Sequence, residues 1–129
     1  MITRRFALTG ALLVLAAAPL QAMPKGVAYT PAAFAEAQAA GKSILVVIHA
    51  PWCPTCKVQD PIINKLLGEA RYGGIQVFVV DYDTQKDALR ALNAPKQSTL
   101  IGFKGTRETN RSSGDTNPLN IEDLIESTL

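Results

Sequence analysis

The chain has 129 residues, of which 47% are hydrophobic and 19% are charged, and these values suit one folded domain rather than a disordered or fibrous protein. It carries 13 basic and 11 acidic residues; without Arg4 and Arg5, which lie in a segment that we expect to be removed, the two signs balance at 11 each. A balanced charge with one tryptophan and no basic cluster argues against nucleic-acid binding.

The first 22 residues have the three parts of a secretory signal peptide. A charged start precedes an apolar run over residues 6–18, and the small residue Ala22 marks a cleavage site. The run is shorter than the ~20 residues that a membrane span needs, although a retained anchor or a buried helix is the alternative. We therefore expect residues 1–22 to be removed and residues 23–129 to form one domain in the periplasm. The paired arginines make the twin-arginine route a candidate.

Two nearly continuous apolar runs, at residues 43–49 and 75–81, predict strands that are buried on both faces of a sheet. A helix over residues 32–40 precedes the first strand and opens on a Thr-Pro capping pair. A second helix over residues 56–67 connects the two strands, with apolar residues near helical spacing and a kink at Pro61.

The second half of the chain predicts a short helix over residues 85–92, a hairpin and a closing helix. The hairpin joins residues 99–103 and 106–111 through a Lys-Gly turn, and the last helix opens at Asn117. Buried strands that alternate with helices, followed by a hairpin, predict an α/β fold with a central mixed sheet flanked by helices.

Cys53 and Cys56, the only cysteines, lie where the first buried strand gives way to a helix. Their spacing places both sulfurs at one side of a helix N-terminus, close enough to bond. The free N–H groups and the positive end of that helix stabilise a thiolate at Cys53, which makes it the nucleophile. We expect Cys56 to be less exposed and to resolve the mixed disulfide.

Two structural alternatives compete with redox chemistry at this pair. A static disulfide would close a very small loop and stabilise the fold little. A zinc site would need two further ligands, and His49 is the only histidine. Redox activity is therefore favoured over both.

Three features of the chain from residue 44 to residue 129 resemble the thioredoxin family. The run Trp52-Cys53-Pro54-Thr55-Cys56-Lys57 resembles its active-site motif, Pro61 falls at its helix-kink proline, and residues 98–105 resemble the strand after its cis-proline. The resemblance implies a thioredoxin fold and thiol–disulfide exchange with protein substrates through a Cys53–Cys56 redox pair, without a cofactor or metal. The residues that it implies in substrate binding are Trp52, Pro54, Thr55, Gln97, Ser98 and Thr99.

Two positions depart from the family pattern. Thioredoxins usually bury an acidic residue six positions before the first cysteine, where this chain has Val47. Ser98 occupies the cis-proline position, in a loop that in the family faces the cysteines and binds substrate through its backbone. Because a cis bond before a non-proline residue costs ~3 kcal/mol, we expect the Gln97–Ser98 bond to be trans.

His49 lies four residues before Cys53, where thioredoxins often have an aromatic residue. The favoured interpretation is a neutral histidine that fills the core. The alternatives are a proton acceptor for Cys56, or a third metal ligand beside Cys53 and Cys56. The last of these would make the chain a non-enzymatic copper-binding protein or metallochaperone, because soft thiolates favour Cu(I).

The pattern as a whole predicts an exported thiol–disulfide oxidoreductase. The sequence does not determine whether the protein oxidises or reduces its substrates, although reduction is slightly favoured. The expected partners are exported proteins with cysteines and a membrane redox protein that resets the Cys53–Cys56 pair; nucleic acid is not expected.

Overall fold

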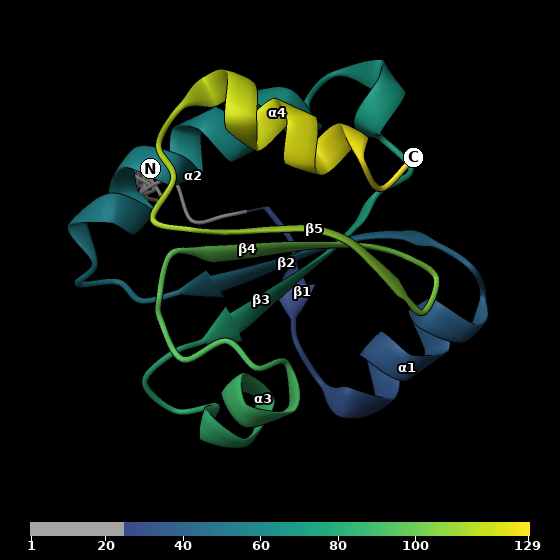
Figure 1. Ribbon diagram of the computed structural model, residues 1–129, viewed down its shortest axis with the longest axis horizontal. Coiled ribbons are helices and arrows are strands. Elements are labelled where there is room, and N and C mark those ends of the chain that lie inside the picture. The colour runs from purple at the N-terminus through teal and green to yellow at the C-terminus, as the bar shows by residue number, and fades with distance from the viewer. Residues whose placement is uncertain (1–24) are drawn as a thin grey trace, which may run out of the picture.

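The computed structural model describes residues 25–129, which form one five-stranded sheet with helices on both faces (Figure 1). The strands are β1 (Val27–Ala28), β2 (Ser43–His49), β3 (Gln76–Asp81), β4 (Thr99–Lys104) and β5 (Arg107–Ser113). Their order in the sheet is β1-β3-β2-β4-β5. The first three are mutually parallel, whereas β4 runs antiparallel to β2 and to β5. The prediction of an α/β fold with a mixed sheet is confirmed.

The helices divide into two pairs, one on each face of the sheet (Figure 1). The helices α2 (Pro54–Leu67) and α4 (Pro118–Glu126) cover one face, and α1 (Pro31–Ala39) and α3 (Lys86–Ala91) cover the other. A 3-10 turn, η1 (Ala70–Tyr72), follows α2.

The central strand β2 supplies side chains to both layers of the core because successive residues of a strand point to opposite faces. Ile44, Val46 and Ile48 belong to the apolar cluster with α1 and α3. Leu45 and Val47 belong to the cluster with α2 and α4. The same alternation places His49, the last residue of β2, on the α2 face. The strand therefore delivers its final polar side chain beneath the start of the helix that follows.

The main differences from the predicted elements lie at boundaries and in short segments. The helix α2 begins at Pro54 rather than residue 56 and continues through Pro61, which lacks only the N–H of one helical hydrogen bond. The sequence analysis missed β1 and η1, since two or three residues carry no periodicity of their own. The predicted signal peptide and its cleavage site lie outside the described residues.

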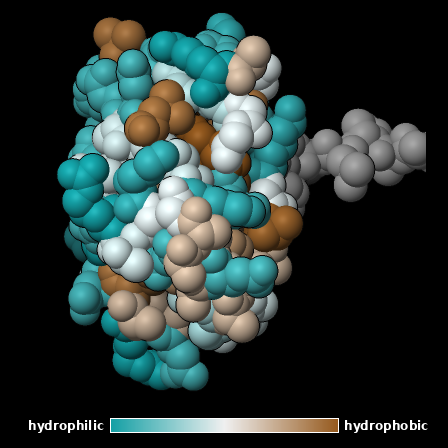
Figure 2. Space-filling model, turned by 90° about the vertical axis from the view of Figure 1, so that its right-hand side faces the viewer, coloured by the Kyte–Doolittle hydropathy of each residue, from teal (hydrophilic) through white to brown (hydrophobic). Residues whose placement is uncertain are grey.

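The face of the molecule at the N-terminal end of β2 has a mixed surface, on which hydrophilic residues surround smaller hydrophobic areas (Figure 2). Hydrophobic areas that are interrupted by hydrophilic residues are ordinary for a protein surface. None of the helices within residues 25–129 combines the length and the apolar character that crossing a membrane requires.

Candidate active site

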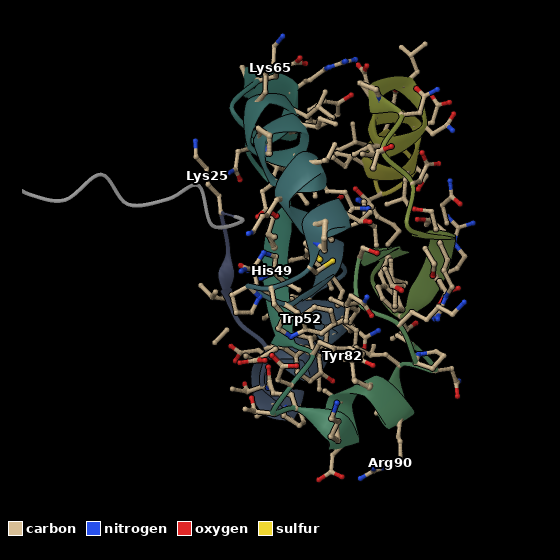
Figure 3. All side chains as sticks on the ribbon, turned by 90° about the vertical axis from the view of Figure 1, so that its left-hand side faces the viewer. Lys25, His49, Trp52, Lys65, Tyr82 and Arg90 are labelled. Carbon is tan, nitrogen blue, oxygen red and sulfur yellow. The ribbon has the colours of Figure 1, made fainter. Side chains whose placement is uncertain are left out.

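The two cysteines lie at the N-terminus of α2, immediately after β2 (Figure 3). Cys53 is the N-cap of this helix, in an extended conformation with φ −76° and ψ 113°. Its Sγ accepts a hydrogen bond of 3.1 Å from the backbone N–H of Cys56. Pro54 occupies the first helical position, where a residue without an N–H loses no hydrogen bond. The sulfur of Cys53 thus receives a helix N–H that would otherwise be unpaired, an arrangement that stabilises a thiolate.

Cys56 differs from Cys53 in its hydrogen bonding and not in its exposure. Both residues are free thiols and both are 1% exposed, so the expectation that Cys56 is the less exposed of the two is wrong. Burial, followed by a hydrogen bond to Cys53, raises the pKa of the Cys56 thiol to about 12, and backbone hydrogen bonds from Ala50 and Ser98 oppose the rise. Cys56 is therefore a protonated thiol at neutral pH that donates to the sulfur of Cys53.

Ser98 lies beside the cysteines, in the loop that leads into β4. A backbone hydrogen bond from Ser98 reaches the Cys56 thiol, and the Ser98 N–H also donates to Ile48 O at 2.9 Å. The Gln97–Ser98 peptide bond is trans, which is the isomer that the cost of a cis bond before a non-proline residue favours. Ser98 has a φ of 56°, in the left-handed region that non-glycine residues seldom adopt. The loop therefore approaches the cysteines through backbone groups held in a strained conformation.

Gln59, which the sequence analysis missed, ties this loop to α2. Its side chain is 1% exposed, and its Nε2 donates to Ser98 O at 3.1 Å and to Asp115 O at 2.8 Å. Ser98 O accepts a further bond of 3.0 Å from the N–H of Gly114. The sequence offers one sign of this role, which is that Gln59 lies at helical spacing from Cys56. That spacing does not reveal the carbonyl groups that Gln59 binds, which lie 39 and 56 residues away in the chain.

Trp52 forms the exposed edge of the site and is 52% exposed (Figure 3). Its Nε1 donates to both carboxylate oxygens of Asp83 at 3.0 Å, and its ring packs edge-on against Tyr82 at 6.1 Å between centroids. These contacts hold an apolar surface beside the cysteines.

The other predicted substrate-binding residues differ in how accessible they are. Pro54 is exposed, and Thr55 and Gln97 are half-buried. Thr99 is 1% exposed and its Oγ1 donates to Lys96 O at 2.7 Å, so its side chain is not available at the surface.

His49 is paired with Asp60, a residue that the sequence analysis did not single out. Their side chains are buried, with His49 Nε2 and Asp60 Oδ2 3.0 Å apart. Burial raises the pKa of the Asp60 carboxyl, and the hydrogen bond and charge of His49 act in the opposite direction. The predicted core position of His49 is confirmed, but its partner comes from α2. The signal in the sequence was the spacing of four residues from Cys56 to Asp60, which places both on one helix face.

The alternative in which Cys53, Cys56 and His49 together bind a metal is not supported by their arrangement. No cluster of three or more histidine, cysteine, aspartate or glutamate residues within residues 25–129 is arranged to hold a metal ion. The physical reason is that Nε2 of His49 is directed at the carboxylate of Asp60 rather than at the sulfurs.

Comparison with known proteins identifies what this arrangement is similar to. The family model for thioredoxin matches residues 26–127. Thioredoxin-2 of Saccharomyces cerevisiae is 33% identical over 92 residues, which cover 70% of this chain and 86% of that protein. The thiol:disulfide interchange protein DsbE of Yersinia pestis is 38% identical over 55 residues, 42% of this chain and 27% of DsbE. The crystal structure of Trxlp from Edwardsiella tarda has a TM-score of 0.74 at 39% identity and covers 77% of this chain and 96% of its own.

Proposed function

Since this chain belongs to the thioredoxin family and is a thiol–disulfide oxidoreductase, we propose that it is exported and reduces disulfide bonds in exported proteins. The observation that carries the proposal is the asymmetry of the cysteine pair. Cys53 caps a helix and accepts two hydrogen bonds at its sulfur, whereas Cys56 is held as a buried, protonated thiol. The Cys53 sulfur therefore suits the role of the nucleophile, and Cys56 suits the role of the resolving thiol.

The exchange proceeds in two displacements. The Cys53 thiolate attacks one sulfur of a substrate disulfide, the substrate S–S bond breaks, and the second substrate sulfur leaves as a thiolate that takes up a proton. Cys56 then loses its proton and attacks the sulfur of Cys53, which breaks the mixed disulfide and releases the first substrate sulfur. The products are a substrate dithiol and a Cys53–Cys56 disulfide. A membrane redox protein resets the pair by the same steps in reverse.

Reduction is the favoured direction because the Cys53 thiolate receives only neutral donors. Pro54 and Thr55, between the cysteines, carry no charge, and the exposed Lys57 is the first charged residue after them. A strongly stabilised thiolate favours the dithiol form and makes an oxidant, so a Cys53 sulfur that receives only neutral donors supports a reductant.

The reduction potential of Cys53–Cys56 tests this direction. The protein is equilibrated in glutathione redox buffers and the disulfide fraction is measured by the mass shift on alkylation; Cys56→Ser, which cannot close the pair, is the control. We expect a potential nearer to about −270 mV than to about −120 mV. A value near the second figure would mean that the protein oxidises its substrates.

Export is supported by the charged start, the apolar run and Ala22 in the first 22 residues. The full chain is expressed in a Gram-negative host, the cells are fractionated, and the mass of the protein in each fraction is measured. We expect a periplasmic species that begins at Met23. Replacement of Arg4 and Arg5 by lysine distinguishes the twin-arginine route, since export by the general route would persist. An uncleaved protein confined to the cytosol would contradict the proposal.

A further inference from the structure

His49 and Asp60 form a buried pair one helical turn behind Cys56, and neither takes part in the two displacements described above. We propose that Asp60, positioned by His49, accepts the proton that Cys56 loses when it attacks the mixed disulfide. This inference rests on the exchange chemistry proposed for Cys53 and Cys56, and it assigns a proton acceptor that the core of β2 lacks at Val47.

The two residues reach the cysteines from different elements. Asp60 follows Cys56 by four residues on the buried face of α2, so their Cβ atoms are about 5–6 Å apart. His49 ends β2 immediately before Ala50, whose backbone hydrogen-bonds the Cys56 thiol. The hydrogen bond between His49 and Asp60 therefore connects β2 to α2 one helical turn after Cys56.

One oxygen of the Asp60 carboxyl group is available to accept a proton. Oδ2 is engaged by His49, but Oδ1 is buried and has no hydrogen-bonding partner among the described residues. A buried acceptor without a hydrogen-bonding partner lowers the stability of the fold by roughly 1–3 kcal/mol, so the presence of one here calls for an explanation. Burial also raises the pKa of Asp60, which makes it a stronger base than an exposed carboxylate.

Cys56 needs such a base because only a thiolate attacks a disulfide. Its pKa of about 12 leaves a negligible thiolate fraction at neutral pH. Formation of the mixed disulfide removes the Cys53 thiolate, which is one cause of the raised pKa of Cys56. Burial, the largest cause of that raised pKa, persists. A sulfur that is 1% exposed has little contact with bulk solvent, which favours an acceptor inside the protein.

The proton balance of the step is simple. The proton of the Cys56 S–H passes through one bridging water to Oδ1 of Asp60, while the Nε2–H of His49 holds Oδ2 in place. The Cys56 thiolate then forms the bond to Cys53 Sγ, and the substrate sulfur departs with the electron pair of the broken bond. The proton on Asp60 passes to that departing thiolate or to solvent, which restores the carboxylate.

The other charged groups around the pair are few and face elsewhere. Asp81, the register partner of His49 on β3, is exposed and its Oδ1 accepts from Asp83 N. Lys57 lies on the exposed side of α2. The carboxylate of Asp115, beyond Gln59, accepts from Asn117 and Asn120 at the surface. The titration of Asp60 is therefore governed by burial, which raises its pKa, and by His49, which lowers it.

A single-turnover reaction with an aromatic disulfide separates the two displacements. Reduced protein is mixed with 5,5′-dithiobis(2-nitrobenzoate) in a stopped-flow instrument. Attack by Cys53 releases one coloured thiolate, and attack by Cys56 on the mixed disulfide releases the second. Because this leaving group departs as a stable thiolate, the second phase reports the deprotonation and attack of Cys56. Both phases are recorded from pH 6 to pH 9 for wild type and Asp60→Asn, with Asp81→Asn as the matched control and Cys56→Ser to identify the first phase.

We expect Asp60→Asn to slow the second phase at pH 7 by about tenfold or more, within the range of general-base effects, and to make it rise more steeply with pH. The first phase and the Asp81→Asn control should change by less than about twofold. His49→Gln, which keeps a donor for the carboxylate, should slow the second phase less than Asp60→Asn does. An unchanged second phase in folded Asp60→Asn overturns the inference. If the wild-type protein shows no first phase, the proposed function is overturned instead, because Cys53 then does not attack the disulfide.

Discussion

Cys53 and Cys56 are equally buried, so their chemical difference comes from the groups that contact each sulfur. The Cys53 sulfur accepts a helix N–H, and the Cys56 thiol donates to Cys53 within an apolar cluster that includes Ala50. Exposure therefore does not distinguish the attacking thiol from the other, whereas the raised pKa of the Cys56 thiol does.

Alkylation of the single-cysteine variants measures this difference. In Cys56→Ser, Cys53 should react with iodoacetamide at pH 7 at least about tenfold faster than Cys56 reacts in Cys53→Ser, because burial raises the pKa of Cys56 even without its partner. The rate at Cys56 should keep rising above pH 9. In urea, where burial is lost, the two rates should converge. Faster modification of Cys56 at pH 7 would reverse the assigned roles.

Ser98 stands where the thioredoxin family usually has a cis-proline, and its backbone conformation differs from that of a proline although the fold is retained. Family resemblance alone suggests that proline suits this position. Its φ of 56° and its hydrogen bond to Ile48 O both conflict with proline, which requires a φ near −65° and has no N–H.

We therefore expect Ser98→Pro to lower the free energy of unfolding by about 3 kcal/mol or more. Ser98→Gly keeps the N–H and tolerates the positive φ, so it should change that free energy by less than about 1 kcal/mol. Urea unfolding of both variants measures the effect. Equal stability of Ser98→Pro and wild type would show that the loop readily adopts a second conformation.

At the level of elements, α2 both presents the cysteines and holds the loop that faces them. The buried side of this helix includes Cys56, Gln59 and Asp60. Cys56 reacts, Gln59 binds the carbonyls of Ser98 and Asp115, and Asp60 binds His49 of β2. The helix is thus connected through polar side chains to the sheet and to two loops that flank the site.

Gln59→Met tests the contribution of the link from α2 to the loops. Methionine fills a similar volume but leaves two carbonyl groups without this donor, and Ser98 O keeps only the N–H of Gly114. We expect a loss of about 1–3 kcal/mol in the free energy of unfolding, measured with urea. Gln38→Met, on α1, is the control and should stay within about 0.5 kcal/mol. Equal effects of the two substitutions would mean that the hydrogen bonds of Gln59 add little.

For the whole molecule, the buried carboxyl group of Asp60 links stability to pH. Its pKa is raised in the folded state, so the protonated form is favoured by folding. The associated stabilisation is fully present below the ordinary aspartate value of about 3.9 and is lost as the pH rises through the raised folded value.

Asp60→Asn, which does not titrate, should therefore gain stability relative to wild type as the pH rises from about 4, and the difference should become constant above the raised pKa. Thermal or urea unfolding of both proteins at closely spaced pH values measures this difference, with Asp81→Asn as the control. A difference that decreases with rising pH would indicate that His49 stabilises the Asp60 carboxylate more than burial destabilises it.

The order of the main elements and the location of the cysteine pair could be predicted from the sequence alone. Runs such as residues 43–49 and the capped helices carry their own periodicity, and the spacing of Cys53 and Cys56 is a local property of a helix start. These features depend on neighbours within a few residues, and the chain displays them directly.

Which polar side chains meet at the site depends on the tertiary structure and could not be predicted from local patterns. His49 and Asp60 are eleven residues apart and come from different elements, so their pairing follows from the packing of α2 on β2. The positive φ of Ser98 depends on hydrogen bonds to Ile48, Gln59 and Gly114, of which none is adjacent to it in the sequence. Burial also set the protonation of Cys56, because the cost of an ion depends on everything that surrounds it in three dimensions.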